Sequence, residues 1–310
     1  MAKPDSSKCG ANEKLDNVQN KAEDIKNKIT EQLGLGADAS TIRDNLKELL
    51  APLDQVMTEV APKLAAIAPV SLQGGIKDFI SGFDSESNQV KIGGEIKGFD
   101  FIEYFGKKQI KRMDRFVQFG LIATKEAMED SKLDLENEDR DRIGVYYGSG
   151  IGGLATIANE EDKAKEKGYD RVSPYFIPSA IINIAAGQIA IEYGLNGMAT
   201  SAVTACASAT NSIGDAFRSI RDGYLDVVVT GGTESSLIPL GLGGFNVMQA
   251  LNKSNDPSYA SIPFDKNRSG FVMGEGAGTI VIEEYEHAIK RGATIYAEIA
   301  GYGATCDAYH

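Results

Sequence analysis

The stretch Ser201-Ala-Val-Thr-Ala-Cys206-Ala-Ser-Ala-Thr210 places one cysteine where an apolar run ends and a helix is expected to begin. The next residues, 207–222, are good helix formers, and their apolar side chains recur at helical spacing at Ile213, Ala216, Phe217 and Ile220. Cys206 is therefore predicted at or just before a helix N-terminus. There, free amide N–H groups and the helix dipole favour the thiolate, the nucleophilic form of cysteine. The alternative is a buried structural cysteine, because free cysteine is among the most buried residue types.

Small side chains flank Cys206 and leave room for a long substrate to approach the sulfur; they are Ala205, Ala207, Ser208 and Ala209. Downstream, Asp226-Val-Val-Val-Thr-Gly-Gly-Thr-Glu234 predicts a short apolar strand that ends in a glycine turn. The segment Asp265-Lys-Asn-Arg-Ser-Gly-Phe-Val-Met-Gly-Glu-Gly-Ala-Gly278 is polar and then glycine-rich, and a strand is expected after it at Thr279–Glu283.

Together these segments resemble the β-ketoacyl-acyl carrier protein synthases of the thiolase superfamily, and the elongating branch, synthase II, in particular. The resemblance extends from about residue 75 to residue 310 without a large gap, and its motifs follow one another at family spacing. It implies a thiolase-like layered α/β fold, first half only, in which a mixed five-stranded sheet lies between helices. The first strand of that sheet has no counterpart in this sequence.

The resemblance implies an acyltransferase of fatty acid biosynthesis that needs no metal or organic cofactor. The thiolate of Cys206 takes an acyl group from acyl carrier protein as a thioester. Malonyl-carrier protein then loses carbon dioxide, and the resulting enolate attacks the thioester to give β-ketoacyl-carrier protein. The backbone N–H of Cys206 is expected to form half of an oxyanion hole. The implied partner is therefore acyl carrier protein, in its acyl- and malonyl-loaded forms.

The resemblance also assigns residues to an acyl pocket. Ile151, in the loop Gly148-Ser-Gly-Ile-Gly-Gly153, and Phe245 match residues that line the pocket. Phe176, in the proline-bounded loop Ser173–Ser179, matches a residue that reaches the pocket of a partner subunit, so a homodimer is expected. Without the resemblance, these side chains would be read as ordinary packing residues, and a lone glycine-rich loop is weak evidence for a dinucleotide site.

The family takes two histidines, a lysine and the second oxyanion donor from motifs of its C-terminal half, and none of these motifs occurs here. The sequence has only two histidines, His287 and His310. His287 is expected on the surface of an exposed helix, and His310 is not assigned a catalytic role. The resemblance therefore predicts a chain truncated at the C-terminus, with an uncovered apolar face, that is inactive or poorly soluble as it stands.

Residues 1–73 are predicted to form a separate α-helical segment, with the synthase-like domain occupying 74–310. Apolar side chains in steps of three and four form a narrow helical seam at Leu15, Val18, Ala22, Ile25 and Ile29. The seam is interpreted as a packed face, and a partner-binding segment is the alternative. This segment stands where the family has its opening strand, so its origin is left open.

Several further elements are expected within the domain: a helix over 116–130, a strand over 143–147, a helix over 180–193 and a strand over 296–301. Asp265, Arg268 and Glu275 are expected to form a structural ion-pair network. A basic cluster is interpreted either as a solvated face or as a docking site for an acidic carrier protein; it comprises Lys107, Lys108, Lys111, Arg112 and Arg115.

Composition narrows the function classes. Of 310 residues, 42% are hydrophobic and 25% charged, as in a globular protein. The net charge is −12, which argues against general nucleic-acid binding. The three cysteines, Cys9, Cys206 and Cys306, form no disulfide framework, so a reducing compartment is expected. No apolar run reaches the roughly 18 residues of a membrane span, and no signal peptide is recognised, so the expected location is the cytoplasm.

Two other functions stay open on sequence grounds. A polyketide-type ketosynthase would share the cysteine motif. A non-catalytic interaction protein, with a helical N-terminus on a synthase fragment, would not use the thiol.

Overall fold

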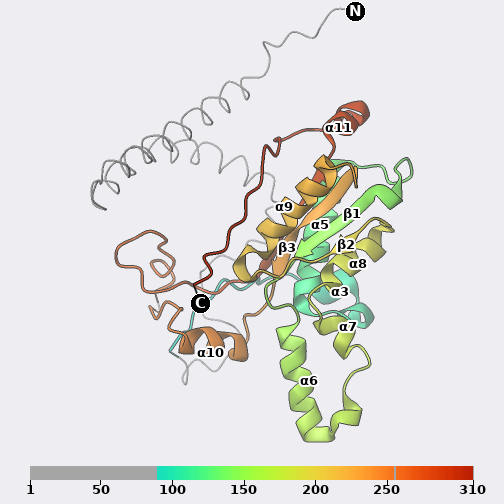
Figure 1. Cartoon of the computed structure of the whole chain (residues 1–310). Coiled ribbons are helices and arrows are strands. Elements are labelled where there is room, and N and C mark those ends of the chain that lie inside the picture. Colours follow the sequence, from blue (N-terminus) through green and yellow to red (C-terminus); the bar gives the residue numbers. More distant parts are fainter. Residues whose placement is uncertain (1–88, 255, 310) are drawn as a thin grey trace, which may run out of the picture. The chain divides into compact units, whose positions relative to one another are not determined.

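The structure is a computed structural model, and it describes residues 89–254 and 256–309. The predicted helical segment 1–73 and its boundary lie outside these residues and stay predictions. The helices and strands, labelled as in Figure 1, are α3 Phe101–Phe105, α4 Lys107–Ile110, α5 Arg115–Ser131, η3 Arg140–Arg142, β1 Ile143–Gly148, α6 Leu154–Lys167, η4 Tyr169–Arg171, α7 Phe176–Ala180, α8 Ile184–Tyr193, β2 Ala199–Thr200, η5 Ala205–Ala207, α9 Ser208–Arg221, β3 Val227–Glu234, α10 Pro239–Val247, β4 Gly276–Glu283 and α11 Tyr285–Arg291.

The strands of the described part form one mixed four-stranded sheet in the order β2-β1-β3-β4. β1 is parallel to both of its neighbours, and it pairs with β3 over its whole length, from Ile143 opposite Val227 to Gly148 opposite Gly232. β4 runs antiparallel to β3. The prediction of a mixed sheet is therefore confirmed, whereas the predicted absence of its first strand concerns residues outside the described part and stays a prediction.

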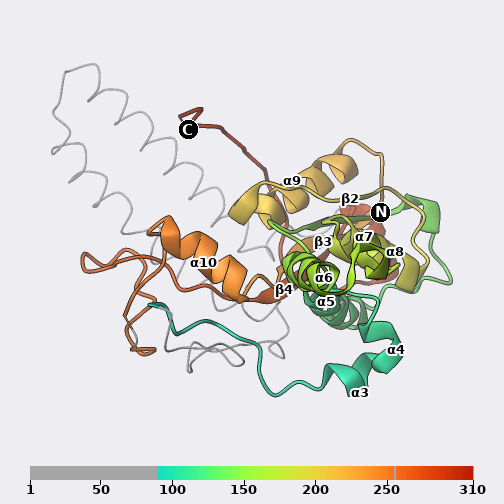
Figure 2. The same cartoon turned by 90° about the horizontal axis from the view of Figure 1, so that it is seen from below.

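Helices cover both faces of the sheet (Figures 1 and 2), because the central strands are apolar on both sides. Side chains alternate along each strand. Val145 and Val229 point into the main core with Phe116 of α5 and Ile189 of α8. Tyr146 and Val228 point to the opposite face, where they pack with Ala216 of α9 and with Leu225. The sheet therefore carries α5 and α8 on one face and α9 on the other.

Helix α5 is capped at its N-terminus by Asp114, whose carboxylate accepts a hydrogen bond from the amide of Phe116 (3.3 Å), and at its C-terminus by Lys132 in the left-handed conformation. Phe116 and Phe119 are completely buried. These bounds confirm the helix predicted over 116–130. β1 likewise confirms the strand predicted over 143–147, and it extends to Gly148.

The structure corrects three sequence predictions about elements. β3 does not end in a glycine turn, because Gly231 and Gly232 both continue the strand to Glu234. The helix predicted over 180–193 is confirmed at its end but begins only at Ile184, as α8, because Ile181 adopts an extended conformation after α7. The segment 296–301 is not a strand; the hydroxyl of Tyr296 instead donates to the carboxylate of Asp130 at the end of α5 (3.0 Å).

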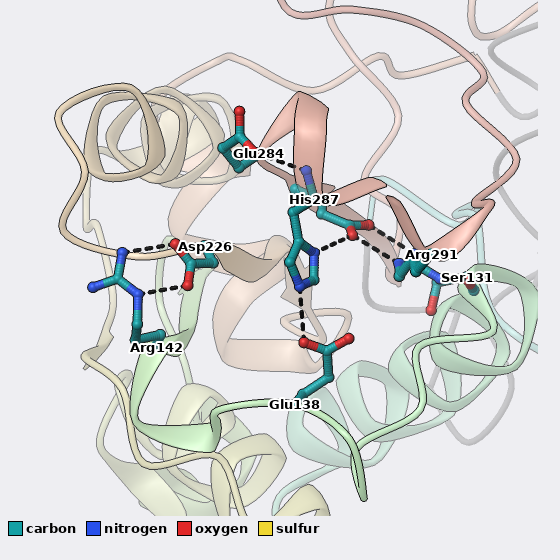
Figure 3. A network of polar contacts seen from close by, with 8 residues as sticks. Ser131, Glu138, Arg142, Asp226, Glu284, His287 and Arg291 are labelled. Atoms are coloured by element: carbon teal, nitrogen blue, oxygen red, sulfur yellow. Dashed lines mark hydrogen bonds and ion pairs between the residues drawn. The ribbon is translucent and has the colours of Figure 1, made fainter. Parts of the chain in front are cut away.

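His287 is not a free surface residue, which corrects the prediction for it (Figure 3). Its Nε2 lies 3.0 Å from a carboxylate oxygen of Glu138, and its Nδ1 contacts Glu283. Arg291 also binds Glu283, at 2.6 Å, and donates from Nη1 to the carbonyl of Ser131 (2.9 Å). The ring therefore joins α11 and β4 to the loop that precedes η3.

The charges around His287 favour its protonated form. Burial, the largest single influence, lowers the pKa of His287, but the hydrogen bond to Glu283 and the negative charges of Glu138 and Glu283 outweigh it and raise the pKa above its usual value. Nearby, the hydrogen bond from Arg142 lowers the pKa of Asp226, so that pair stays ionised at neutral pH.

This network is expected to make stability depend on pH. Because the pKa of His287 is raised in the folded chain, its stabilisation should be complete below about pH 6.5 and lost as the pH rises through the folded-state pKa. The measurement is urea unfolding of the parent and of His287→Gln from about pH 5.5 to about pH 8.5. The difference between their free energies of unfolding should shrink as the pH rises. A difference that stays constant or grows would contradict the prediction.

Candidate active site

Cys206 lies in the short turn η5, two residues before Ser208, the first residue of α9, and its side chain is exposed. The prediction that this cysteine lies at or just before a helix N-terminus is confirmed. The alternative of a buried structural cysteine is wrong. An exposed thiol at the start of a helix has the access that a nucleophile needs.

The buried side chain of Ser208 stabilises the turn that carries Cys206. Its hydroxyl accepts a hydrogen bond from the amide of Thr204 (2.9 Å) and donates to the carbonyl of Ala205 (2.7 Å). Ala205 has a φ of 51°, a left-handed conformation that costs a residue with a Cβ about 1 kcal/mol. The surrounding hydrogen bonds must therefore hold the turn in this shape.

Two glycines allow α9 to start close against the sheet. A Cβ on Gly148, at the end of β1, would lie 2.5 Å from the carbonyl carbon and oxygen of Ser208. A Cβ on its strand partner Gly232 would lie 2.7 Å from the Cβ of Ala209. The turn with Cys206 therefore sits at the carboxyl ends of the two central parallel strands, where α/β sheets commonly bind ligands.

The glycine loop after β1 lies against the same turn. A Cβ on Gly150 would be 3.2 Å from the carbonyl oxygen of Ala205. The amides of Gly150 and Ile151 each donate to one carboxylate oxygen of Glu234, at 3.0 Å. The other oxygen of Glu234 accepts from the hydroxyl of Ser236 (2.7 Å). Ile151 is therefore held in a loop that neighbours the Cys206 turn.

Glu234 was not singled out in the sequence. Its signal is a carboxylate at the end of a buried strand in a chain that also has a glycine loop with exposed amides. Because the loop is 83 residues away in sequence, the pairing requires the fold.

The two predicted phenylalanines occupy different places. Phe245, on α10, packs against a small core that includes Leu242 and Met273, with its ring 5.4 Å from that of Phe271. α10 also approaches the start of α6, since a Cβ on Gly241 would lie 3.5 Å from the side chain of Leu154. The structure therefore brings α10 close to the first residue of α6, three residues after Ile151.

Phe176 begins α7 and lines a hollow of about 170 Å³ together with residues of α6, among them Thr156 and Asn159. Figures 1 and 2 show α7 away from α10 in both views. Phe176 and Phe245 are thus not brought to one place within the chain. This separation agrees with the expectation that Phe176 serves a partner subunit's pocket, and that expectation stays a prediction.

The predicted network of Asp265, Arg268 and Glu275 is wrong. Arg268 is exposed and donates only to the backbone carbonyl of Asp265 (2.9 Å). Glu275 is 4% exposed and pairs with Arg115 at 2.8 Å. A buried carboxylate needs a charged partner, and the first residue of α5 supplies it. Glu275 also accepts from the amide of Ile96 (3.0 Å), which fixes the segment before α3.

Four of the five residues of the predicted basic cluster lie together. The fifth, Arg115, points to Glu275 instead. The remaining four side chains line an open hollow of about 390 Å³ together with Tyr175; they are Lys107, Lys108, Lys111 and Arg112. The guanidinium of Arg112 lies 4.8 Å from the centre of the Tyr175 ring. This surface can receive an acidic or anionic group.

Residues 89–254 and 256–309 contain neither a candidate metal site nor a candidate membrane-spanning helix. Within these ranges, no three side chains of histidine, cysteine, aspartate or glutamate are grouped so that they could hold a metal ion. No helix of the same described part has both the length and the apolar character needed to cross a membrane.

Comparison with known proteins gives consistent matches. Residues 75–288 match the beta-ketoacyl synthase, N-terminal domain family. A curated relative, 3-oxoacyl-[acyl-carrier-protein] synthase 2 of Staphylococcus aureus strain N315, is 46% identical over 233 residues, which are 75% of this chain and 56% of the relative. The chain therefore spans little more than half the length of this relative.

Solved structures give the same result. A beta-ketoacyl synthase from Burkholderia phymatum matches with a TM-score of 0.67 and 30% identity, covering 79% of this chain and 60% of that protein. A type II polyketide acyl-carrier protein in complex with its ketosynthase bound to the hexaketide matches with a TM-score of 0.56 and 26% identity, covering 64% and 55%. The thiolase-like fold predicted from the sequence is confirmed.

Proposed function

Because this chain belongs to the beta-ketoacyl synthase family, we propose that it acts in the condensation step of fatty acid elongation, with Cys206 carrying the acyl group. The observation that supports this most is the exposed thiol at the start of α9. The 46% identity to a 3-oxoacyl-[acyl-carrier-protein] synthase 2 favours fatty acid synthesis over polyketide synthesis.

The step proposed for these residues is acyl transfer. The Cys206 sulfur attacks the thioester carbonyl of an acyl carrier protein, the carbon–sulfur bond to the carrier breaks, and the carrier thiol leaves with a proton. The amide of Cys206 is proposed to donate to the oxyanion of the tetrahedral intermediate. The decarboxylating histidines of the family belong to motifs that this sequence does not contain, so no residue here is assigned to that step.

We assign Ile151 and Phe245 to the acyl pocket and Phe176 to the pocket of a partner subunit in a homodimer. The Ile151 assignment is supported by the contact between its loop and the Cys206 turn. The Phe245 assignment is supported by the contact of α10 with Leu154, the first residue of α6, which directly follows the loop of Ile151.

The direct test is acyl transfer from an acyl-loaded carrier protein to the full chain. Intact-mass analysis should show one added acyl group, and peptide analysis should locate it on Cys206. A chain whose Cys206 reacts with iodoacetamide but never takes an acyl group would refute the proposal in favour of a non-catalytic protein. Efficient transfer from polyketide-type thioesters alone would favour the polyketide reading.

We further propose that the basic cluster of Lys107, Lys108, Lys111 and Arg112 docks the carrier protein. Carrier proteins are acidic, and a similar ketosynthase structure is a complex with an acyl-carrier protein. Charged groups at the rim of an interface mainly raise the rate and strength of encounter.

The double variant Lys108→Glu/Lys111→Glu is therefore expected to slow acylation by an acyl carrier protein about tenfold at low salt, since two rim charges change sign. Acylation by a small soluble thioester should be unchanged. Lys290→Glu, on the exposed face of α11, is the matched control and should behave like the parent. Equal slowing with both substrates would contradict a docking role.

A further inference from the structure

The segment that follows α11 passes along α9 (Figure 1) and is seated on it by one tyrosine. The ring of Tyr302 lies so close to α9 that a Cβ on Gly214 would come within 2.3 Å of it. One helical turn further along α9, the guanidinium of Arg218 lies 4.8 Å from the ring centre. The ring alone therefore has enough contacts to hold the segment on the helix.

The hydroxyl of Tyr302 has a separate role. It accepts a hydrogen bond from the side-chain amide of Asn211 (2.8 Å). The carbonyl oxygen of that amide accepts from the hydroxyl of Thr204 (2.9 Å). Thr204 stands two residues before Cys206, and its backbone amide donates to Ser208. A continuous series of hydrogen bonds therefore connects Tyr302 with the Cys206 turn.

This series of hydrogen bonds supports the strained turn from a second side. Ser208 holds the turn from the buried side, whereas Thr204 is exposed and Ala205 is left-handed. Without Asn211 and Tyr302, the Thr204 side chain would have no hydrogen bond that fixes it to α9 from the solvent side. The turn could then relax, and the sulfur would no longer be presented at the first turn of α9.

We propose that Tyr302 is a positioning residue for Cys206, acting through Asn211 and Thr204. The proposal rests on the proposed function of Cys206 as the reactive thiol. It makes the reactivity of Cys206 depend on a hydroxyl group 96 residues away in sequence, in the segment after α11.

The test uses Tyr302→Phe in the full chain, which removes the hydroxyl and keeps the ring. The probe is iodoacetamide, and the readout is the alkylation rate of each cysteine, measured by peptide mass. We expect the Cys206 rate to fall about fivefold, as for the loss of one hydrogen bond. Cys306 is exposed in the same segment as Tyr302, and its rate should not change. Tyr224→Phe, an exposed tyrosine beyond the other end of α9, is the matched control.

A second pair of variants separates positioning from a general loosening of the fold. Thr204→Val should reproduce the fall in the Cys206 rate, and Thr204→Ser, which keeps a hydroxyl, should restore it. In the double variant Tyr302→Phe/Thr204→Val, Cys206 should be alkylated no more slowly than in either single variant, since both changes interrupt the same series of hydrogen bonds. An unchanged Cys206 rate in Tyr302→Phe, or a faster one, would overturn the proposal. So would a fall shared by Cys306.

The alkylation and acyl-transfer experiments test the two proposals separately. If the chain takes no acyl group from carrier protein but Tyr302→Phe still slows alkylation of Cys206, the proposed function is wrong and the positioning role stands. If acyl transfer occurs and Tyr302→Phe alkylates at the parent rate, the positioning role is wrong and the proposed function stands.

Discussion

Cys206→Ala is expected to abolish acylation of the chain by acyl carrier protein, with a loss of at least about a thousandfold. Alanine has no nucleophile, and no other group in the turn can form a thioester. The free energy of unfolding should change by no more than about 0.5 kcal/mol, because the Cys206 side chain is exposed. Loss of acylation without loss of stability would assign the chemistry to the sulfur itself.

The control is Cys306→Ala, which removes the other exposed cysteine of the described residues. This variant should be acylated at the parent rate. Intact mass gives the extent of acylation in each protein, and urea unfolding gives the stability. If Cys206→Ala still acquires a stable acyl group, another residue carries it, and the assignment of Cys206 is wrong.

The Cys206 turn could be predicted from sequence because its signals are local. Helical spacing of apolar residues and a run of small residues coincide within 20 positions of the cysteine. The strand Val227–Glu234 was located by its apolar run for the same reason. The prediction of its end is wrong, because the glycine pair that predicts a turn continues the strand.

The glycines of β3 are instead required because residues from elsewhere in the sequence pack closely against them. A Cβ on Gly231 would lie 2.0 Å from the carbonyl oxygen of Gly278, and one on Gly232 would meet Ala209. Both constraints come from elements that only the fold brings together. A sequence pattern shows that glycine is present but does not show which backbone approaches it.

Charged partners were missed for a similar reason. The sequence predicts an ion pair for Glu275 but not its partner, because Arg115 lies 160 residues earlier. His287 was read from its own helix, whereas Glu138 approaches it from the loop before η3. Helical spacing predicts neighbours three or four residues apart, and these contacts are long-range.

The same close packing gives the second large effect, expected for Gly148→Ala. The new Cβ would lie 2.5 Å from the carbonyl carbon and oxygen of Ser208 and 2.9 Å from the amide nitrogen of Ala209. All three contacts are with backbone atoms, so no side chain can rotate away. Either β1 must shift from its pairing with β3, or the start of α9 must move out. We expect a loss of about 3 kcal/mol in the free energy of unfolding.

A matched control has the opposite expected sign. Gly243 lies within α10, is exposed, and a Cβ there would meet nothing within 4 Å. Gly243→Ala should therefore stabilise the chain by about 0.5–1 kcal/mol, because alanine is the better helix former. Urea unfolding of both variants measures the two effects. Because Ser208 also holds the Cys206 turn, Gly148→Ala should slow alkylation of Cys206 while the control leaves it unchanged. A Gly148→Ala chain that is as stable as the parent would show that α9 does not start against β1 as described.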